Sequence, residues 1–198
     1  MEQSKSSMSI KKKFQSVSDF GIYDALNHGL RYVLNGYYLV VGSDDTLNSR
    51  TIENYFSILR SFPADIICTC ILQNGRIITP KKRLGWLYGM PGITSSHSVG
   101  MLINRKLHDK FGYYSQNYPI AADQLFIKTV VYGGASVFHS KYVSGEFSVN
   151  GISGTDSLSL ITDIFRVQFV TEKFKFLQII LFILRLFKFY VFKCIFSK

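Results

Sequence analysis

The apolar run at residues 37–41 constrains the fold most, because it is a short candidate strand with a helical pattern on each side. Apolar residues recur at helical spacing over residues 22–33 and again over residues 48–60, and Asn35-Gly36 is a typical helix end. The run itself is rich in β-forming residues and shows no polar alternation, which predicts a strand buried on both faces of a mixed sheet. A helix, a strand and a second helix in this order indicate an α/β fold.

The remainder of the chain continues the alternation of strands and helices. The dipeptide Asn74-Gly75 separates two apolar runs and predicts a tight hairpin. A chain of 198 residues has room for one domain, in which we expect a mixed α/β sheet flanked by helices. The expected downstream elements are strands at residues 65–73, 76–79 and 135–143, helices at residues 105–110 and 122–132, and a long irregular loop at residues 80–98.

The basic residues are concentrated at the two ends of the chain. Of the formal net charge of +10, residues 173–198 carry +6 without a single acid, and residues 1–13 carry +3. The body between them is nearly neutral and offers no basic groove, which argues against a nucleic-acid partner. Residues 1–13 are polar and lack an apolar segment, so we expect no cleavable signal peptide.

The basic C-terminal segment is also the most apolar part of the chain. On a helical wheel its polar residues fall within an arc of roughly 140°. These residues are Lys175, Gln178, Arg185, Lys188 and Lys193. We expect an amphipathic helix in the interface of a membrane that contains anionic lipid. A spanning helix stays open but is disfavoured, because each mid-helix cation would cost roughly 2.5–3.5 kcal/mol at the bilayer centre. A helix buried in an oligomer is the third alternative.

Two adjacent carboxylates, Asp44 and Asp45, follow the run at residues 37–41. In open α/β sheets, ligands bind beyond the carboxyl ends of the strands. A pair of hard oxygen ligands suits Mg²⁺ or Mn²⁺ that is also bound by the phosphate oxygens of a substrate. The alternative is a turn in which these residues cap the following helix, and for an isolated Asp-Asp pair the residues alone favour that alternative.

Two segments follow a known sequence pattern. SDFGIYDALNHG at residues 18–29 is followed by GSDD at residues 42–45. This order resembles the inverting family 2 glycosyltransferases of bacterial polysaccharide synthesis, in which a D-x-G-I-Y-D-A-x-N-x-G helix precedes a strand ending in a D-x-D-like or S-D-D motif. Similar segments that extend the resemblance over residues 13–154 are SHSV at 96–99, RKL at 105–107, FGYY at 111–114, IAADQLF at 120–126 and NGIS at 150–153.

The resemblance implies a GT-A fold, transfer of a sugar with inversion, and roles for individual residues. The implied site residues are Asp45 for the divalent metal, Asp19, Asn27 and Asp44 for the nucleotide-sugar donor, Asp123 as general base, and His97 on the acceptor side. Without the resemblance, Asp123 is more simply a helix N-cap, and His97 is a histidine of a loop or of the core.

The opening half of the family pattern has no counterpart in this sequence. The strand ending in P-x-Y-N and the D-G-x-S-x-D-G-T turn would need roughly 60 residues in two βα units. We therefore expect a leader at residues 1–12, a partial GT-A (nucleotide-diphospho-sugar transferase, Rossmann-like) domain at residues 13–155, and a helical, membrane-associating tail at residues 156–198. Three explanations of the missing opening half are open. They are a start-codon or frame error, a complementing fragment supplied in trans, and a truncated relative that has lost catalysis.

Two functions are open on the sequence alone. The first is a glycosyltransferase that moves a sugar from a nucleotide-sugar to a lipid-linked or polysaccharide acceptor, in the synthesis of O-antigen, capsule or exopolysaccharide. Its place would be peripheral, on the cytoplasmic face of the inner membrane. The alternative is a non-catalytic, membrane-associated remnant that serves as an interaction surface. Binding of a nucleotide-sugar donor distinguishes the two.

Overall fold

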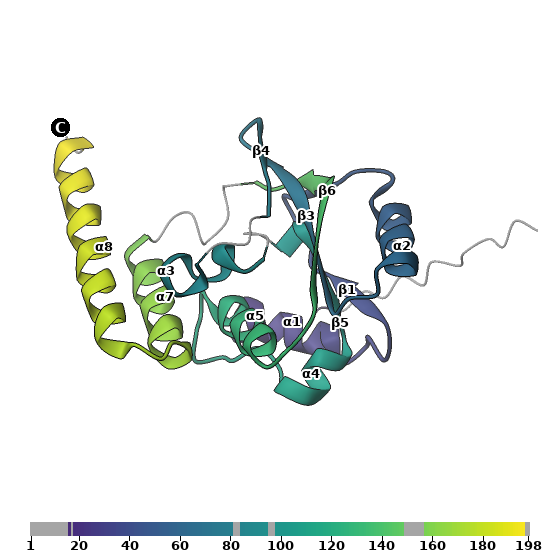
Figure 1. Ribbon diagram of the computed structural model, residues 1–198, viewed down its shortest axis with the longest axis horizontal. Helices are drawn as coiled ribbons and strands as arrows, with labels where there is room; N and C mark the ends of the chain where they lie inside the picture. The colour runs from purple at the N-terminus through teal and green to yellow at the C-terminus, as the bar shows by residue number, and fades with distance from the viewer. Residues whose placement is uncertain (1–15, 17, 81–83, 95–97, 149–156, 197–198) are drawn as a thin grey trace, which may run out of the picture.

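The computed structural model of the protein describes residues 16, 18–80, 84–94, 98–148 and 157–196 (Figure 1). These residues form a six-stranded mixed sheet with the strand order β1-β5-β3-β6-β2, and β4 pairs with β3 beside this path. β3 and β6 are parallel, and the other pairs are antiparallel. The strands are β1 (Tyr37–Leu39), β2 (Thr46–Leu47), β3 (Ile66–Gln73), β4 (Arg76–Ile78), β5 (Met101–Asn104) and β6 (Val137–Glu146).

β3 is the buried centre of the sheet. Its first six residues are all buried, as expected of a strand that is covered on both faces. It pairs with β5 on one side and with β6 on the other. The hairpin from β3 to β4 turns at Asn74 and Gly75, whose φ angles of 49° and 71° are left-handed. The hairpin prediction is therefore confirmed.

The expectation that residues 37–41 form a strand buried on both faces is wrong. β1 covers only Tyr37–Leu39, and of these three residues only Tyr38 is buried. β1 is the end strand of the sheet and pairs with β5 alone among the described strands. With one paired edge, the strand lacks the cover that a central strand has, and Val41 remains 40% exposed.

The helices divide between the two faces of the sheet (Figure 1). On one face, α1, α4 and α5 pack on Ile66, Cys68 and Ile103 to form the larger core. On the other face, α2 packs on Ile67 and Leu102. The helices are α1 (Ile22–Leu30), α2 (Thr51–Ser61), α3 (Gly85–Tyr88), α4 (Lys106–Phe111), α5 (Ala122–Tyr132), α7 (Ser157–Thr171) and α8 (Lys175–Phe196), with 3₁₀ turns η1 (Met90–Gly92) and η2 (Ser98–Gly100). The expected irregular loop at residues 80–98 thus contains α3 and η1. The mixed α/β sheet flanked by helices was predicted correctly.

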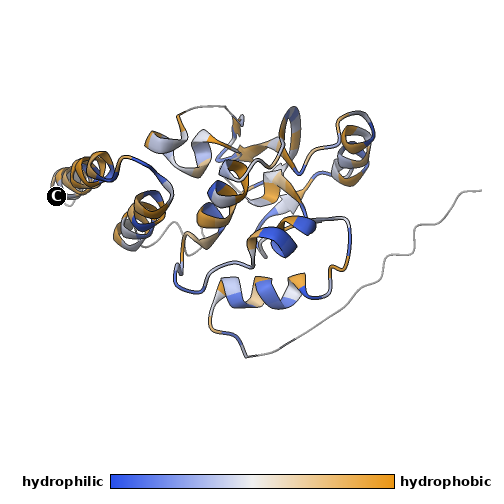
Figure 2. Cartoon of the chain, turned by 60° about the horizontal axis from the view of Figure 1, so that its bottom comes forward, coloured by the Kyte–Doolittle hydropathy of each residue, from blue (hydrophilic) through white to orange (hydrophobic). Residues whose placement is uncertain are grey.

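The C-terminal helices form a layer at the end of the molecule away from α2 (Figure 1). α7 packs against α5, and α8 packs against α7. Most of α8 is apolar, as the hydropathy colouring in Figure 2 shows. Within the parts of the chain that the structure covers, no helix has the length and apolar character needed to cross a membrane.

Candidate active site

The turn after β1 holds two acidic side chains over one glycine. The Asp45 carboxylate accepts hydrogen bonds from the backbone N–H groups of Gly42 (3.1 Å) and Ser148 (3.0 Å), one on each oxygen. A Cβ on Gly42 would lie 3.0 Å from Asp45 Oδ2 and 3.2 Å from Asp44 Oδ1, so glycine leaves the space that both carboxylates occupy. Asp45 is half-buried and fixed, whereas Asp44 is exposed.

This turn connects the two opposite edges of the sheet. β2 follows it directly and pairs with β6, and Ser148, which binds Asp45, follows β6. Each Asp45 oxygen accepts one hydrogen bond and keeps a lone pair for a further partner. Among the residues with described positions, no three His, Cys, Asp or Glu side chains form a metal-binding group. A cation at this turn would therefore need further oxygen ligands from a substrate or from water.

Asp123 lies in the first turn of α5 and is tied to α1. Its Oδ1 accepts hydrogen bonds from the Tyr23 hydroxyl (2.9 Å) and from the Gln124 backbone N–H (2.8 Å). The Tyr23 hydroxyl also lies 2.7 Å from the Ile120 carbonyl oxygen. The N-cap residue of α5 is Ala121 and makes no side-chain capping bond, so the simpler interpretation of Asp123 as the N-cap is wrong.

The surroundings of Asp123 favour its protonated form. Burial raises the pKa of Asp123, and the hydrogen bond from Tyr23 opposes this by lowering it. Burial and the neighbouring carboxyl also raise the pKa of Tyr23, so the hydroxyl stays protonated and donates. Within the described parts, no hydrogen bond reaches Asp123 Oδ2. A half-buried carboxyl with a raised pKa and one free oxygen has the properties of a general base.

The other site residues predicted from the sequence are Asp19, Asn27 and His97, and the structure describes the first two. Asp19 is exposed just before α1 and accepts a hydrogen bond from the Gly21 N–H. Asn27 is buried, and its amide makes a pair of hydrogen bonds with the backbone of Tyr114. A contact between Asn27 and a donor stays a prediction, for which the second N–H of Nδ2 and the second lone pair of Oδ1 are left. His97 lies outside the described residues.

A buried histidine that sequence reasoning missed connects β1 to α4 and α5. His108 Nδ1 lies 2.9 Å from the Gly112 carbonyl oxygen, which can only accept, so Nδ1 carries the hydrogen. His108 Nε2 then accepts from the Tyr38 hydroxyl at 2.6 Å, and Tyr114 donates to Tyr38 at 2.8 Å. The imidazole also stacks on Phe126 at 4.0 Å between ring centroids. The network fixes the strand that precedes the acidic turn.

This network makes stability depend on pH. Burial lowers the pKa of His108 from 6.5 to about 4. The unfolded chain therefore binds a proton more readily than the folded one, and stability falls as the pH drops from about 6.5 to about 4. At 1.36 kcal/mol per pKa unit, the loss is about 3 kcal/mol. Urea unfolding at a series of pH values measures it. His108→Gln, which does not titrate, should remove this part of the slope, and an unchanged slope would contradict the assignment.

Comparison with known proteins identifies the fold. No protein-family model matches the chain, and no curated protein matches it in sequence. Solved structures of S. aureus TarS do match it. TarS 1–349 in complex with UDP-GlcNAc gives a TM-score of 0.54 at 17% identity over 83% of this chain, and TarS 1–349 alone gives 0.53 at 16% over 80%. The chain has a TarS-like fold.

The match to TarS covers only part of each TarS structure. The chain spans 51% and 48% of the two TarS 1–349 structures, which is about half of their length. It spans 28% of a longer TarS structure, with a TM-score of 0.50. The partial, GT-A-like character expected of the domain agrees with this coverage, and identities of 16–17% show the fold alone.

Proposed function

We propose that the chain is part of an inverting glycosyltransferase of family 2 that transfers a sugar from a nucleotide-sugar donor to a lipid-linked saccharide acceptor in the synthesis of a cell-surface polysaccharide. The observation that carries the proposal is the turn with Asp44 and Asp45 in a fold similar to that of TarS, which was solved with UDP and UDP-GlcNAc. The segments that resemble family 2 contribute the residues of this turn.

The acidic turn is the proposed donor-binding site. Asp45 would hold a Mg²⁺ or Mn²⁺ ion, and Asp44 would lie at the nucleotide ribose or diphosphate. Asp19 and Asn27 would help to hold the donor. The two carboxylates over Gly42 fit such an ion, since both are hard oxygen donors and Asp44 faces solvent. When bound, the ion would neutralise the charge of the departing nucleoside diphosphate.

Asp123 is the proposed general base. Its Oδ2 would accept the proton of the acceptor hydroxyl as that oxygen attacks the anomeric carbon and the bond to the diphosphate breaks. The Tyr23 hydroxyl and the Gln124 N–H hold the other oxygen, Oδ1, and so fix the direction of the carboxylate. A single displacement of this kind inverts the anomeric configuration. His97 stays a proposed acceptor-side residue.

The proposed location is the cytoplasmic face of the inner membrane. The outer surface of α8 supports it, since large apolar residues such as Phe176 (76% exposed) and Phe187 (69% exposed) face away from the body. A peripheral protein with a soluble donor and an acceptor in the bilayer would use such a surface. An anionic membrane would also attract the basic residues at the end of the chain.

Binding of nucleotide tests the proposal. We expect UDP or GDP to bind this chain in the presence of Mn²⁺ and chelation of the metal to abolish binding, as measured by isothermal titration calorimetry. Asp45→Asn should weaken binding roughly 10- to 100-fold, because it removes a charged contact worth about 1.5–3 kcal/mol. Glu53→Gln, an exposed acid of α2, is the matched control and should leave the affinity unchanged. If neither nucleotide binds, the alternative of a non-catalytic remnant is favoured.

A further inference from the structure

α8 is turned so that polar residues face the body and apolar residues face outward. Gln178 is 1% exposed, and its amide N–H donates to the Trp86 carbonyl oxygen at 3.0 Å. Arg185 donates to the Leu87 carbonyl oxygen (2.6 Å) and to Gln168 Oε1 (2.7 Å). Gln178 and Arg185, two residues of the polar arc predicted from the sequence, thus dock α8 on α3 and α7. The outward face is left apolar.

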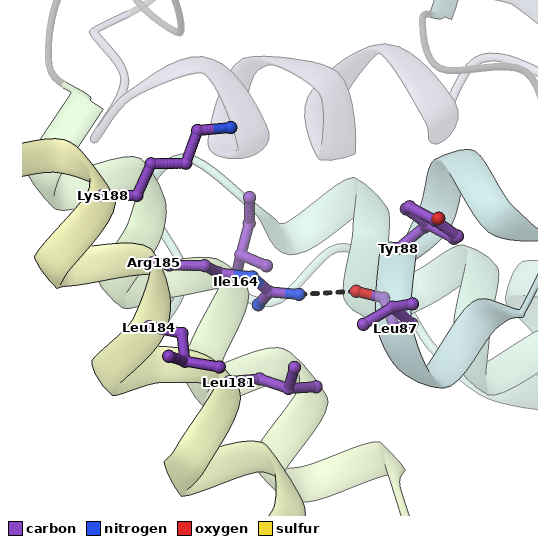
Figure 3. A pocket seen from close by; sticks show the side chains of 7 residues that line it. All are labelled: Leu87, Tyr88, Ile164, Leu181, Leu184, Arg185 and Lys188. Carbon is purple, nitrogen blue, oxygen red and sulfur yellow. Dashed lines mark hydrogen bonds between the residues drawn. The ribbon is translucent and has the colours of Figure 1, made fainter. Parts of the chain in front are cut away.

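A groove of about 410 Å³ lies where α8 meets α3 and α7 (Figure 3). Its walls are mostly apolar, from Leu87 and Tyr88 of the α3 segment, Ile164 of α7, and Leu181 and Leu184 of α8. Figure 3 shows these side chains around the space between the helices. We call this space the α3–α8 groove.

Two cations, Arg185 and Lys188, also line the α3–α8 groove. Neither forms a salt bridge with any residue that the structure describes. The two Arg185 bonds end on neutral oxygens and leave further guanidinium N–H groups for a ligand. Lys188 is exposed and lies 5.7 Å from the centroid of the Phe192 ring. None of the lining residues that the structure describes is an acid, so the charge of the groove complements an anion and its walls complement an apolar chain.

We propose that the α3–α8 groove binds a phosphate-bearing lipid. The phosphate lies between Arg185 and Lys188, and the first carbons of the apolar chain lie against Leu181 and Leu184. A lipid accounts for both parts of the site, since a free phosphate would leave the apolar walls in water and an uncharged lipid would leave the two cations unpaired. The exposed apolar face of α8 continues from the groove and gives the rest of the lipid or its membrane a surface to contact.

Several neighbouring residues lie between the groove and the proposed base. Gly89, directly after α3, lies between two glutamines. A Cβ on Gly89 would be 3.5 Å from Gln124 Oε1 and 3.6 Å from Gln168 Nε2. Gln168 binds Arg185, and Gln124 is the neighbour of Asp123. The inference deepens the proposed function and rests on it for the lipid-linked acceptor, which would carry a phosphate like the lipid in the groove. Binding of a lipid in the groove does not itself require sugar transfer.

A soluble short-chain phosphatidic acid, used below its micelle concentration, tests the groove without a membrane. We expect it to bind the full chain saturably, as followed by intrinsic tyrosine and tryptophan fluorescence, since Tyr88 lines the groove and Trp86 lies in the same helix. Lys188→Gln should weaken binding about tenfold, which corresponds to the loss of one charge-assisted contact. Lys173→Gln removes the same charge at an exposed position outside the groove and should change binding less than about twofold.

A second matched pair tests the apolar wall. Leu184 and Ile183 are neighbours on α8 with nearly equal exposure, 57% and 58%, but only Leu184 lines the groove. Leu184→Gln should weaken binding about fivefold, and Ile183→Gln should leave it unchanged. Circular dichroism checks that all four variants fold.

Four results would overturn the inference. The first is the absence of saturable binding. The second is an equal loss of affinity in Lys188→Gln and Lys173→Gln, because general electrostatic attraction predicts equal losses. Binding of inorganic phosphate with the same affinity would show an anion site without a lipid. Self-association that buries the outer face of α8 and prevents lipid binding would show a protein partner instead. Asp45→Asn should not alter lipid binding, so failure of the donor site and failure of the groove are distinguishable.

Discussion

Asp123→Asn should lower the rate of sugar transfer roughly 10²- to 10⁴-fold and leave nucleotide binding unchanged. Asparagine has nearly the same shape, and its Oδ1 can still accept the hydrogen bonds from Tyr23 and Gln124. What it cannot do is take a proton from the acceptor hydroxyl. The measurement is the release of nucleoside diphosphate from a sugar donor in the presence of acceptor, in a form of the protein that is competent for transfer.

Tyr23→Phe separates the role of the base from that of its support. The Tyr23 hydrogen bond lowers the pKa of Asp123, so its removal should raise that pKa further. Because the base acts in its ionised form, the rate should rise with pH through the pKa of Asp123, and the rise should move to higher pH in Tyr23→Phe. An Asp123→Asn variant with the full rate would refute the assignment of the base.

The second large effect concerns the stability of the tail. Glu172→Ala should lower the free energy of unfolding by about 3–5 kcal/mol. Lys128 of α5 is fully buried and forms a salt bridge with Glu172, which follows α7 and also accepts a hydrogen bond from the Tyr132 hydroxyl. Burial lowers the pKa of Lys128, and the Glu172 carboxylate opposes this. Removal of the acid would leave a buried ammonium group without a counter-charge.

Urea unfolding measures this effect, and two variants control for it. Asp109→Ala breaks an ion pair with Arg105 at an exposed carboxylate and should cost less than about 1 kcal/mol. The double variant Lys128→Met with Glu172→Ala should recover most of the stability, because it removes the buried charge together with its partner. A cost of Glu172→Ala no greater than that of Asp109→Ala would show that the buried pair does not hold α7 to α5.

Local patterns predicted the elements that depend on neighbouring residues. The periodicity over residues 22–33 predicted α1, although the helix ends at Leu30 and not at Asn35-Gly36. Asn74-Gly75 predicted the hairpin because both residues tolerate left-handed angles. The acidic turn was also visible, since it needs only a strand end and a glycine. The helix expected at residues 48–60 begins three residues later, at Thr51, because Asn48 still donates hydrogen bonds to the distant β6 from its backbone and its side chain.

The features that the sequence could not predict depend on distant partners. The position of β1 at the end of the sheet depends on which strand pairs with it, and the partner is β5. His108 has partners on β1 and in the loop after α4, so nothing near it in the sequence marks it. A helical wheel shows that Arg185 and Gln178 share a face, but the carbonyl oxygens that turn this face inward belong to the α3 segment.

The edge of β1 belongs to the sheet, and the outer face of α8 belongs to the helical layer at one end of the molecule (Figure 1). Among the residues with known placement, no strand pairs with the outer edge of β1, whereas α8 offers aromatic side chains, so the two surfaces attract different kinds of neighbour. If contacts between copies join one surface to the other, the resulting head-to-tail arrangement does not close on itself and grows with concentration. Detergent would shield the helical end but not the strand end, so a homogeneous preparation of this chain calls for both to be covered.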